Sequence, residues 1–149
     1  MSDLEKLRVW LQAYPGASAL ADMQVDYTDS VPGMFGVFPS GLMEISRMTD
    51  IIGNTTVRNQ YNFALRVVFA KAPGDDIGAS ANAEWLMEFQ RWVQVQSATR
   101  KAPTFGNTDT ESETMSAQNG MLVDADDEGL ATYLVQLTAT FKTYYETEE

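Results

Sequence analysis

A long stretch of alternating residues in the middle of the chain constrains the fold most. Between Val57 and Phe69, every second position is apolar except Asn59, and the positions between are mostly polar and include Arg58 and Arg66. Side chains of a β-strand alternate between the two faces of a sheet, so this pattern predicts a strand with one dry and one wet face. The segment exceeds the usual strand of ~5–6 residues. A strand of this length often projects beyond its domain and pairs with a neighbour, and a bend or bulge partway along is the alternative.

Two amphipathic segments are predicted to form helices. In residues 2–14, Ser2 and Glu5 have the spacing of a capping box, apolar side chains recur at helical spacing, and Pro15-Gly16 ends the pattern. A second helix is expected to begin at a cap supplied by Ser80 or Asn82 and to end near residue 98. Its stripe of Trp, Leu, Phe and Val side chains is typical of core packing rather than of a ligand site.

Shorter alternating segments predict the remaining strands. They cover residues 23–28 and 42–48, followed by a terminal hairpin with arms at 114–123 and 130–144 around an acidic turn at 124–129. The expected order is α-β-β-β-α-β-β. This order predicts an α+β fold in which two helices pack on one face of a mainly antiparallel sheet, and the whole chain, residues 1–149, is expected to form a single domain.

Two segments are expected to be irregular. Residues 29–41 are rich in Gly and Pro, which makes a long regular element improbable, and their apolar side chains either fold onto the core or meet a partner. Residues 100–113 are polar and are interrupted by Pro103 and Gly106, which is typical of a mobile connector.

The composition argues against most enzyme classes. The 149 residues include no Cys and no His, so thiolate nucleophiles, His-based triads and most zinc or iron sites are excluded. The net charge of −11 opposes direct binding of duplex DNA, which requires a basic surface. No apolar run approaches the ~20 residues of a membrane span, and the first residues lack the pattern of a secretory signal. Synthesis in the cytoplasm is therefore expected.

The best candidate for a metal site is the acidic turn of the terminal hairpin. Asp124, Asp126 and Glu128 match alternate ligand positions of a calcium loop, and Gly129 matches its glycine. The position of the bidentate Glu, however, is occupied by Val135, and the flanking segments are predicted to be strands. We therefore expect no metal ion and no cofactor.

Several segments spread over nearly the whole chain resemble a family of small proteins encoded in the tail-gene clusters of phages and prophages of Gram-positive bacteria. They are LEKLRVWL with YPG (4–11, 14–16), VDYTD with VPG (25–29, 31–33), FPSGL with EISR (38–42, 44–47), GN (53–54), YNFAL (61–65), WL with FQ and WVQ (85–86, 89–90, 92–94), and ATY with QLT (131–133, 136–138). These are the tail-completion, or tail terminator, proteins. Some members carry a label of chloramphenicol resistance, which the absence of a catalytic His in this chain contradicts.

The resemblance implies a structural role in the virion. Tail terminators form a homo-oligomeric ring, commonly a hexamer, at the head-proximal end of the tail tube. The ring stops tube growth and docks to the neck, and the family has no catalytic residues to carry over. The implied partners are further copies of the chain, the tail tube protein and a neck or connector protein. An acidic lumen would let DNA pass without specific binding.

This role predicts two kinds of surface. The expected subunit-interface residues are Met34, Phe35, Val37, Phe38, Arg58, Arg66, Arg100, Lys101 and Phe105. An acidic ring face or lumen is expected at Asp124, Asp126, Asp127 and Glu128. The long strand at 58–69 and the terminal hairpin are expected to supply the sheet edges that pair around the ring. The alternatives are a head–tail connector or neck protein, a tail tube subunit and a small enzyme.

Overall fold

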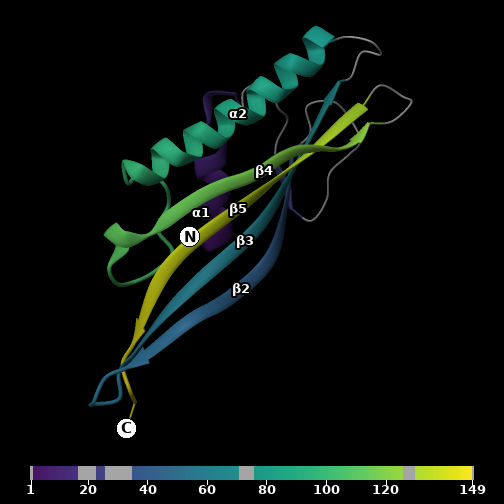
Figure 1. The fold of residues 1–149 in the computed structure, drawn as a ribbon. Helices are drawn as coiled ribbons and strands as arrows, with labels where there is room; N and C mark the ends of the chain where they lie inside the picture. The colour runs from purple at the N-terminus through teal and green to yellow at the C-terminus, as the bar shows by residue number, and fades with distance from the viewer. Residues whose placement is uncertain (1, 17–22, 26–34, 71–75, 126–129, 149) are drawn as a thin grey trace.

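The computed structural model describes residues 2–16, 23–25, 35–70, 76–125 and 130–148. In chain order its elements are α1 (Asp3–Gln12), β1 (Met23–Val25), β2 (Phe35–Thr49), β3 (Thr55–Ala70), α2 (Asp76–Ala98), the 3-10 helix η2 (Thr110–Ser112), β4 (Thr114–Ala125) and β5 (Leu130–Tyr145) (Figure 1).

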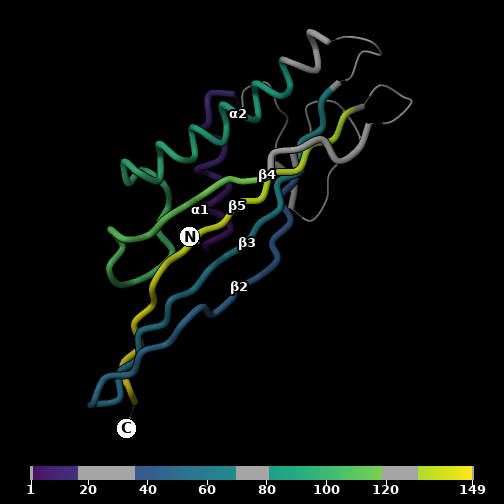
Figure 2. The backbone as a smooth tube through the Cα atoms, viewed as in Figure 1, coloured from purple at the N-terminus to yellow at the C-terminus, as the bar shows by residue number. Residues whose placement is uncertain are grey.

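The strands form one five-stranded sheet in the order β1-β2-β3-β5-β4. Strand β1 is parallel to β2, and every other neighbouring pair is antiparallel. Figure 2 shows β2, β3 and β5 running side by side over most of their length. The predicted α+β fold, the order of helices and strands and the mainly antiparallel sheet are confirmed.

The core lies between one face of the sheet and the two helices. Val37, Leu65 and Val135 are cross-strand neighbours on β2, β3 and β5, and all three side chains are completely buried. From the other side, both helices contribute buried apolar residues to the same cluster. The indoles of Trp10 on α1 and Trp92 on α2 stack with ring centroids 4.8 Å apart, so the helices also pack against each other.

The ends of the helices follow local chemistry. The Ser2 hydroxyl accepts a 3.2 Å hydrogen bond from the Glu5 amide, as the capping-box spacing predicted. The predicted start of α2 is wrong, because the helix begins at Asp76, before Ser80 and Asn82. The helix therefore includes Gly78. A helix tolerates an isolated glycine at a cost of about 1 kcal/mol.

Strand β2 departs from the sequence prediction in two ways. It begins at Phe35, so the first part of the expected loop at 29–41 lies outside the described residues and the rest is strand. Its pairing with β3 shifts register between Pro39 and Leu42, where Gly41 has a φ of 92°, and again between Glu44 and Ser46. Such shifts bend a strand and break its alternation, so the regular alternation expected over 42–48 is wrong.

Candidate assembly interface

The β2–β3 hairpin projects beyond both helices and carries exposed apolar side chains (Figure 1). Every residue from 39 to 52 is exposed. Met48 is 76% exposed and Ile52 is 75% exposed. The other large exposed apolar residues of this segment are Leu42, Met43, Ile45 and Ile51. Large apolar side chains gathered on one exposed segment are typical of an interaction site, and we call residues 42–52 the hairpin patch.

The tip of the hairpin is held by its own polar groups. The Asp50 carboxylate accepts hydrogen bonds from the amides of Ile52 at 3.0 Å and Asn54 at 2.9 Å. Gly53 takes the φ of 92° that the turn requires. Close to the end of the chain, the Thr147 amide donates a 3.0 Å hydrogen bond to the Asn54 side chain, and the Thr147 hydroxyl donates to the Gly53 carbonyl. The exposed apolar side chains therefore stand on a fixed turn.

The hairpin patch borders an open sheet edge. Strand β1 pairs with β2 only from Phe35 to Val37. Beyond Val37, no strand in the described part of the chain pairs with the outer side of β2. An edge strand presents unpaired backbone groups, which makes it a template for another chain. Exposed apolar side chains and an open edge thus occur on the same strand.

The opposite edge of the sheet is covered by α2 along the first residues of β4. The Gln90 side chain on α2 donates a 3.1 Å hydrogen bond to the Ala117 carbonyl of β4, and the Met115 amide donates a 2.9 Å bond to the Ser97 hydroxyl. Strand β5 extends past the first residue of β4. There the Asn107 side chain accepts a 2.7 Å hydrogen bond from the Tyr144 amide and donates a 3.0 Å hydrogen bond to the Tyr144 carbonyl. These contacts occupy backbone groups that would otherwise attract a second chain.

Of the two elements expected to supply pairing edges, the long strand is the wrong one. Strand β3 pairs with β2 on one side and with β5 on the other, so it lies inside the sheet. The terminal hairpin does lie at an edge, because its strand β4 is the outermost strand on the other side of the sheet, and its part in pairing between subunits stays a prediction. A two-faced pattern marks a long strand but does not reveal its place in the sheet, because that place depends on pairing between distant segments.

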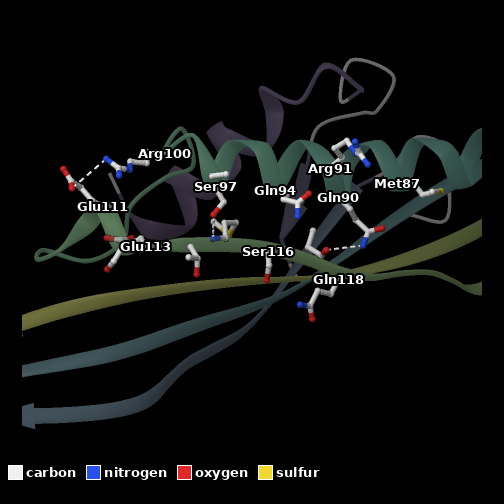
Figure 3. A pocket seen from close by; sticks show the side chains of 15 residues that line it. Met87, Gln90, Arg91, Gln94, Ser97, Arg100, Glu111, Glu113, Ser116 and Gln118 are labelled. Carbon is white, nitrogen blue, oxygen red and sulfur yellow. Dashed lines mark hydrogen bonds and ion pairs between the residues drawn. The ribbon is translucent and has the colours of Figure 1, made fainter.

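A groove runs between α2 and the covered edge of β4, with a volume of about 810 Å³ (Figure 3). Met87, Gln90, Gln94 and Ser97 line its helical wall, and residues 111–118 line the other wall. Met87 is 69% exposed. At one end, Arg100 lies 3.8 Å from Glu111 in an exposed ion pair. Apolar, amide and charged side chains therefore all line this groove.

The predicted interface residues differ in how far they are buried. The assignment of Val37 to an interface is wrong, because its side chain is completely buried in the core. Phe105 is half-buried, and its ring packs on Tyr61 and Phe141. Among the others, Arg58, Arg100 and Lys101 are exposed, whereas Phe38 and Arg66 are half-buried.

Several predicted positions cannot be placed by their side chains. Met34, Asp126, Asp127 and Glu128 lie outside the described residues. Phe35 and Asp124 belong to β2 and β4, and the structure describes only their backbone. The expected acidic face at the turn therefore stays a prediction.

The segment expected to be a mobile connector is instead fixed to the sheet. The Glu113 carboxylate accepts hydrogen bonds from the amides of Phe105 at 2.7 Å and Gly106 at 3.2 Å. Burial raises the pKa of Glu113, and these two amides oppose that shift. Farther along, the Lys142 ammonium donates a 2.9 Å hydrogen bond to Asp109 and lowers the pKa of that carboxyl. Polar composition suggested a loop but hid these anchoring contacts.

Sequence reasoning also missed the hairpin patch. Leu42 occupies an even position, and Met43 and Ile45 occupy odd positions. Apolar residues at both kinds of position indicate apolar side chains on both faces of a strand. That signal was present in the sequence but was interpreted as ordinary alternation.

The described residues contain no group of three carboxylates arranged to hold a metal ion. None of the described helices is long and apolar enough to cross a membrane. No family model matches the sequence, and no curated protein matches it.

Proposed function

We propose that this protein is a structural subunit of a bacteriophage tail, and that it forms a ring which caps the head-proximal end of the tail tube. The observation that carries the proposal is the hairpin patch beside the open edge of β2. An apolar patch that projects from a chain of net charge −11 is a surface for association. The sequence resemblance to tail-completion proteins indicates which assembly this association would build, namely a ring at the end of the tail tube.

The difference between the two sheet edges supports a ring. One edge is open along β2, whereas side chains of α2 cover the first residues of β4 at the other edge and Asn107 covers Tyr144 of β5. A subunit with unlike surfaces on its two sides favours head-to-tail contacts, and such contacts close into a ring when the rotation between neighbours permits it.

The charge of the chain supports passage of DNA through such a ring. Asp and Glu number 21 against ten Lys and Arg. An acidic pore repels the phosphate backbone, so DNA would move through it without being retained. An acidic neck protein or tube subunit would let DNA pass in the same way, and the experiment has to separate the three.

The first experiment silences the gene in the producing phage or prophage and images the induced lysate by negative-stain electron microscopy. Overlong tails of variable length without heads are the result expected for a tail terminator. Tails of normal length beside unjoined full heads would assign the protein to the neck. Absence of tails would assign it to the tube, and intact particles would refute the proposal.

A matched pair of variants connects the phenotype to the hairpin patch. Ile52→Asp places a charge on the patch, and Val95→Asp places the same charge on α2, where Val95 is 50% exposed and does not line the groove. Expressed in trans during silencing, the Val95 variant should restore normal tails and the Ile52 variant should not. Equal rescue by both variants would exclude the hairpin patch as the assembly surface.

A further inference from the structure

We propose that the hairpin patch of one subunit docks in the α2–β4 groove of the next subunit. The inference rests on the proposed function, and it assigns to each subunit one donor surface and one acceptor surface. The donor is the tip around Ile51 and Ile52 with Met48, and the acceptor is the groove around Met87 and Gln94.

The two surfaces are suited in size and chemistry. At about 3.3 Å per residue, the part of β2 from Leu42 to Thr49 extends roughly 25 Å, so the hairpin is long enough to reach a neighbouring subunit. The groove, of about 810 Å³, falls within the range of roughly 300–1,000 Å³ that small-molecule sites occupy, and it has room for the apolar side chains of a turn. Met87 offers an exposed apolar contact at its wall.

Charge allows this contact between two copies of an acidic chain. In the groove, Arg91 and Arg100 balance Glu111 and Glu113. In the hairpin patch, Arg47 binds Glu44 at 2.7 Å, which leaves Asp50 as its one unbalanced charge. Like charges that face each other across an interface cost free energy, and these two surfaces bring together little unbalanced charge although the chain as a whole carries −11.

Hydrogen bonding is also compatible. Gln90 and Ser97 are already bonded to β4. Gln94 lies between them along α2 (Figure 3) and has no hydrogen-bond partner within the described part of the chain. Its amide can donate and accept, so it suits the free backbone groups of an open strand edge.

Strand addition between two β2 edges fits the structure less well. Two identical edges related by a two-fold axis would close a dimer and leave every groove empty. The register shifts after Pro39 and after Glu44 also bend β2, and bulges and edge prolines are devices that discourage edge-to-edge pairing. Docking through side chains avoids both difficulties.

Disulfide trapping tests the proposal directly, because the natural chain has no Cys and introduced thiols are therefore the only ones. The variant Ile52→Cys/Met87→Cys should yield, on mild oxidation, a ladder of covalent oligomers up to the size of the ring. The control Ile52→Cys/Val95→Cys should yield far less. Rings that form in native mass spectrometry without the ladder would overturn the docking inference and leave the proposed function intact. Dimers formed equally well by Ile52→Cys alone would favour two-fold pairing and would also overturn it.

Mixing experiments provide a second readout. Ile52→Asp disrupts the hairpin patch and keeps the groove intact. Met87→Asp disrupts the groove and keeps the hairpin patch intact. Each variant alone should be monomeric with an unchanged Tm, and an equal mixture should form heterodimers through the one intact pair of surfaces. A mixture without heterodimers, under conditions where the natural chain assembles, would overturn the inference. A natural chain that stays monomeric at every concentration would overturn the proposed ring as well.

Discussion

The phenol of Tyr61 on the central strand β3 donates a 2.6 Å hydrogen bond to the Asp3 carboxylate at the start of α1. Burial, the hydrogen bond to Asp3 and the charge of Asp3 together raise the pKa of Tyr61 to about 12. The same ring packs against Phe105 of the connector and Phe141 of β5. One side chain thus joins the sheet, the first helix and the connector.

This relationship predicts loss of stability at alkaline pH. In the unfolded chain the phenol of Tyr61 ionises near its ordinary pKa of 10, and in the folded chain it ionises near 12. Its contribution is therefore complete below about pH 10, falls as the pH rises and is lost above about pH 12, because the unfolded chain releases the proton first. Tyr61→Phe should be about 1 kcal/mol less stable at pH 7 and should lose less stability than the natural protein between pH 9 and 11.5.

Urea unfolding across this pH range measures both effects. Tyr144→Phe is the control, because Tyr144 makes its described hydrogen bonds through its backbone and, unlike Tyr145, is not among the groups that raise the pKa of Tyr61. Parallel alkaline curves for the natural protein and the Tyr61 variant would show that the Asp3 contact does not govern this behaviour.

The side chains that cover β4 should protect the protein from aggregation. Gln90→Ala and Ser97→Ala each remove a hydrogen bond to the β4 backbone, at an expected cost of about 1 kcal/mol each. The double variant should also aggregate at lower concentration, because an uncovered strand edge recruits other chains. Light scattering against concentration measures this, with Val95→Ala as the control from the same helix, because Val95 is exposed and does not line the groove. Equal scattering by the double variant and the control would mean that α2 does not protect the edge.

The elements of the fold could be predicted because their signals are local. The capping pair Ser2 and Glu5 marked the first helix, and alternation from Val57 onward marked β3. The arrangement of the strands was harder, because β2 and β5 enclose β3 through contacts between segments far apart in the chain. The covering of β4 also depends on Gln90 meeting a carbonyl 27 positions away. No periodicity within a segment carries that information.

Arg100 occupies a conformation that normally favours glycine, and replacing it should stabilise the protein. Its φ is 60°, and it follows α2 at the position where the Lys101 amide donates a 2.8 Å hydrogen bond to the Gln96 carbonyl. This is the arrangement in which a left-handed residue closes a helix. Arg100→Gly should raise the free energy of unfolding by about 1 kcal/mol, because glycine adopts this conformation without the steric cost of a Cβ atom.

The loss of the exposed ion pair with Glu111 should matter little. Thermal unfolding in parallel with Arg100→Ala separates the two effects, because alanine removes the charge and keeps the strained backbone. The prediction fails if alanine and glycine give the same Tm.

Gly106 is where the connector approaches β5 too closely for any side chain. A Cβ atom built there would lie 2.0 Å from the Lys142 carbonyl oxygen, which belongs to the backbone and cannot turn aside. Gly106→Ala must therefore displace the connector and weaken the hydrogen bonds between Asn107 and Tyr144. We expect a loss of about 3 kcal/mol, at the upper end of the range for overpacking, together with faster hydrogen exchange at the Tyr144 amide. Gly41→Ala is the matched control, because a Cβ atom there meets nothing within 4 Å and only its φ of 92° opposes the change. A smaller loss for the Gly106 variant than for the Gly41 variant would show that the connector can move away from β5 at little cost.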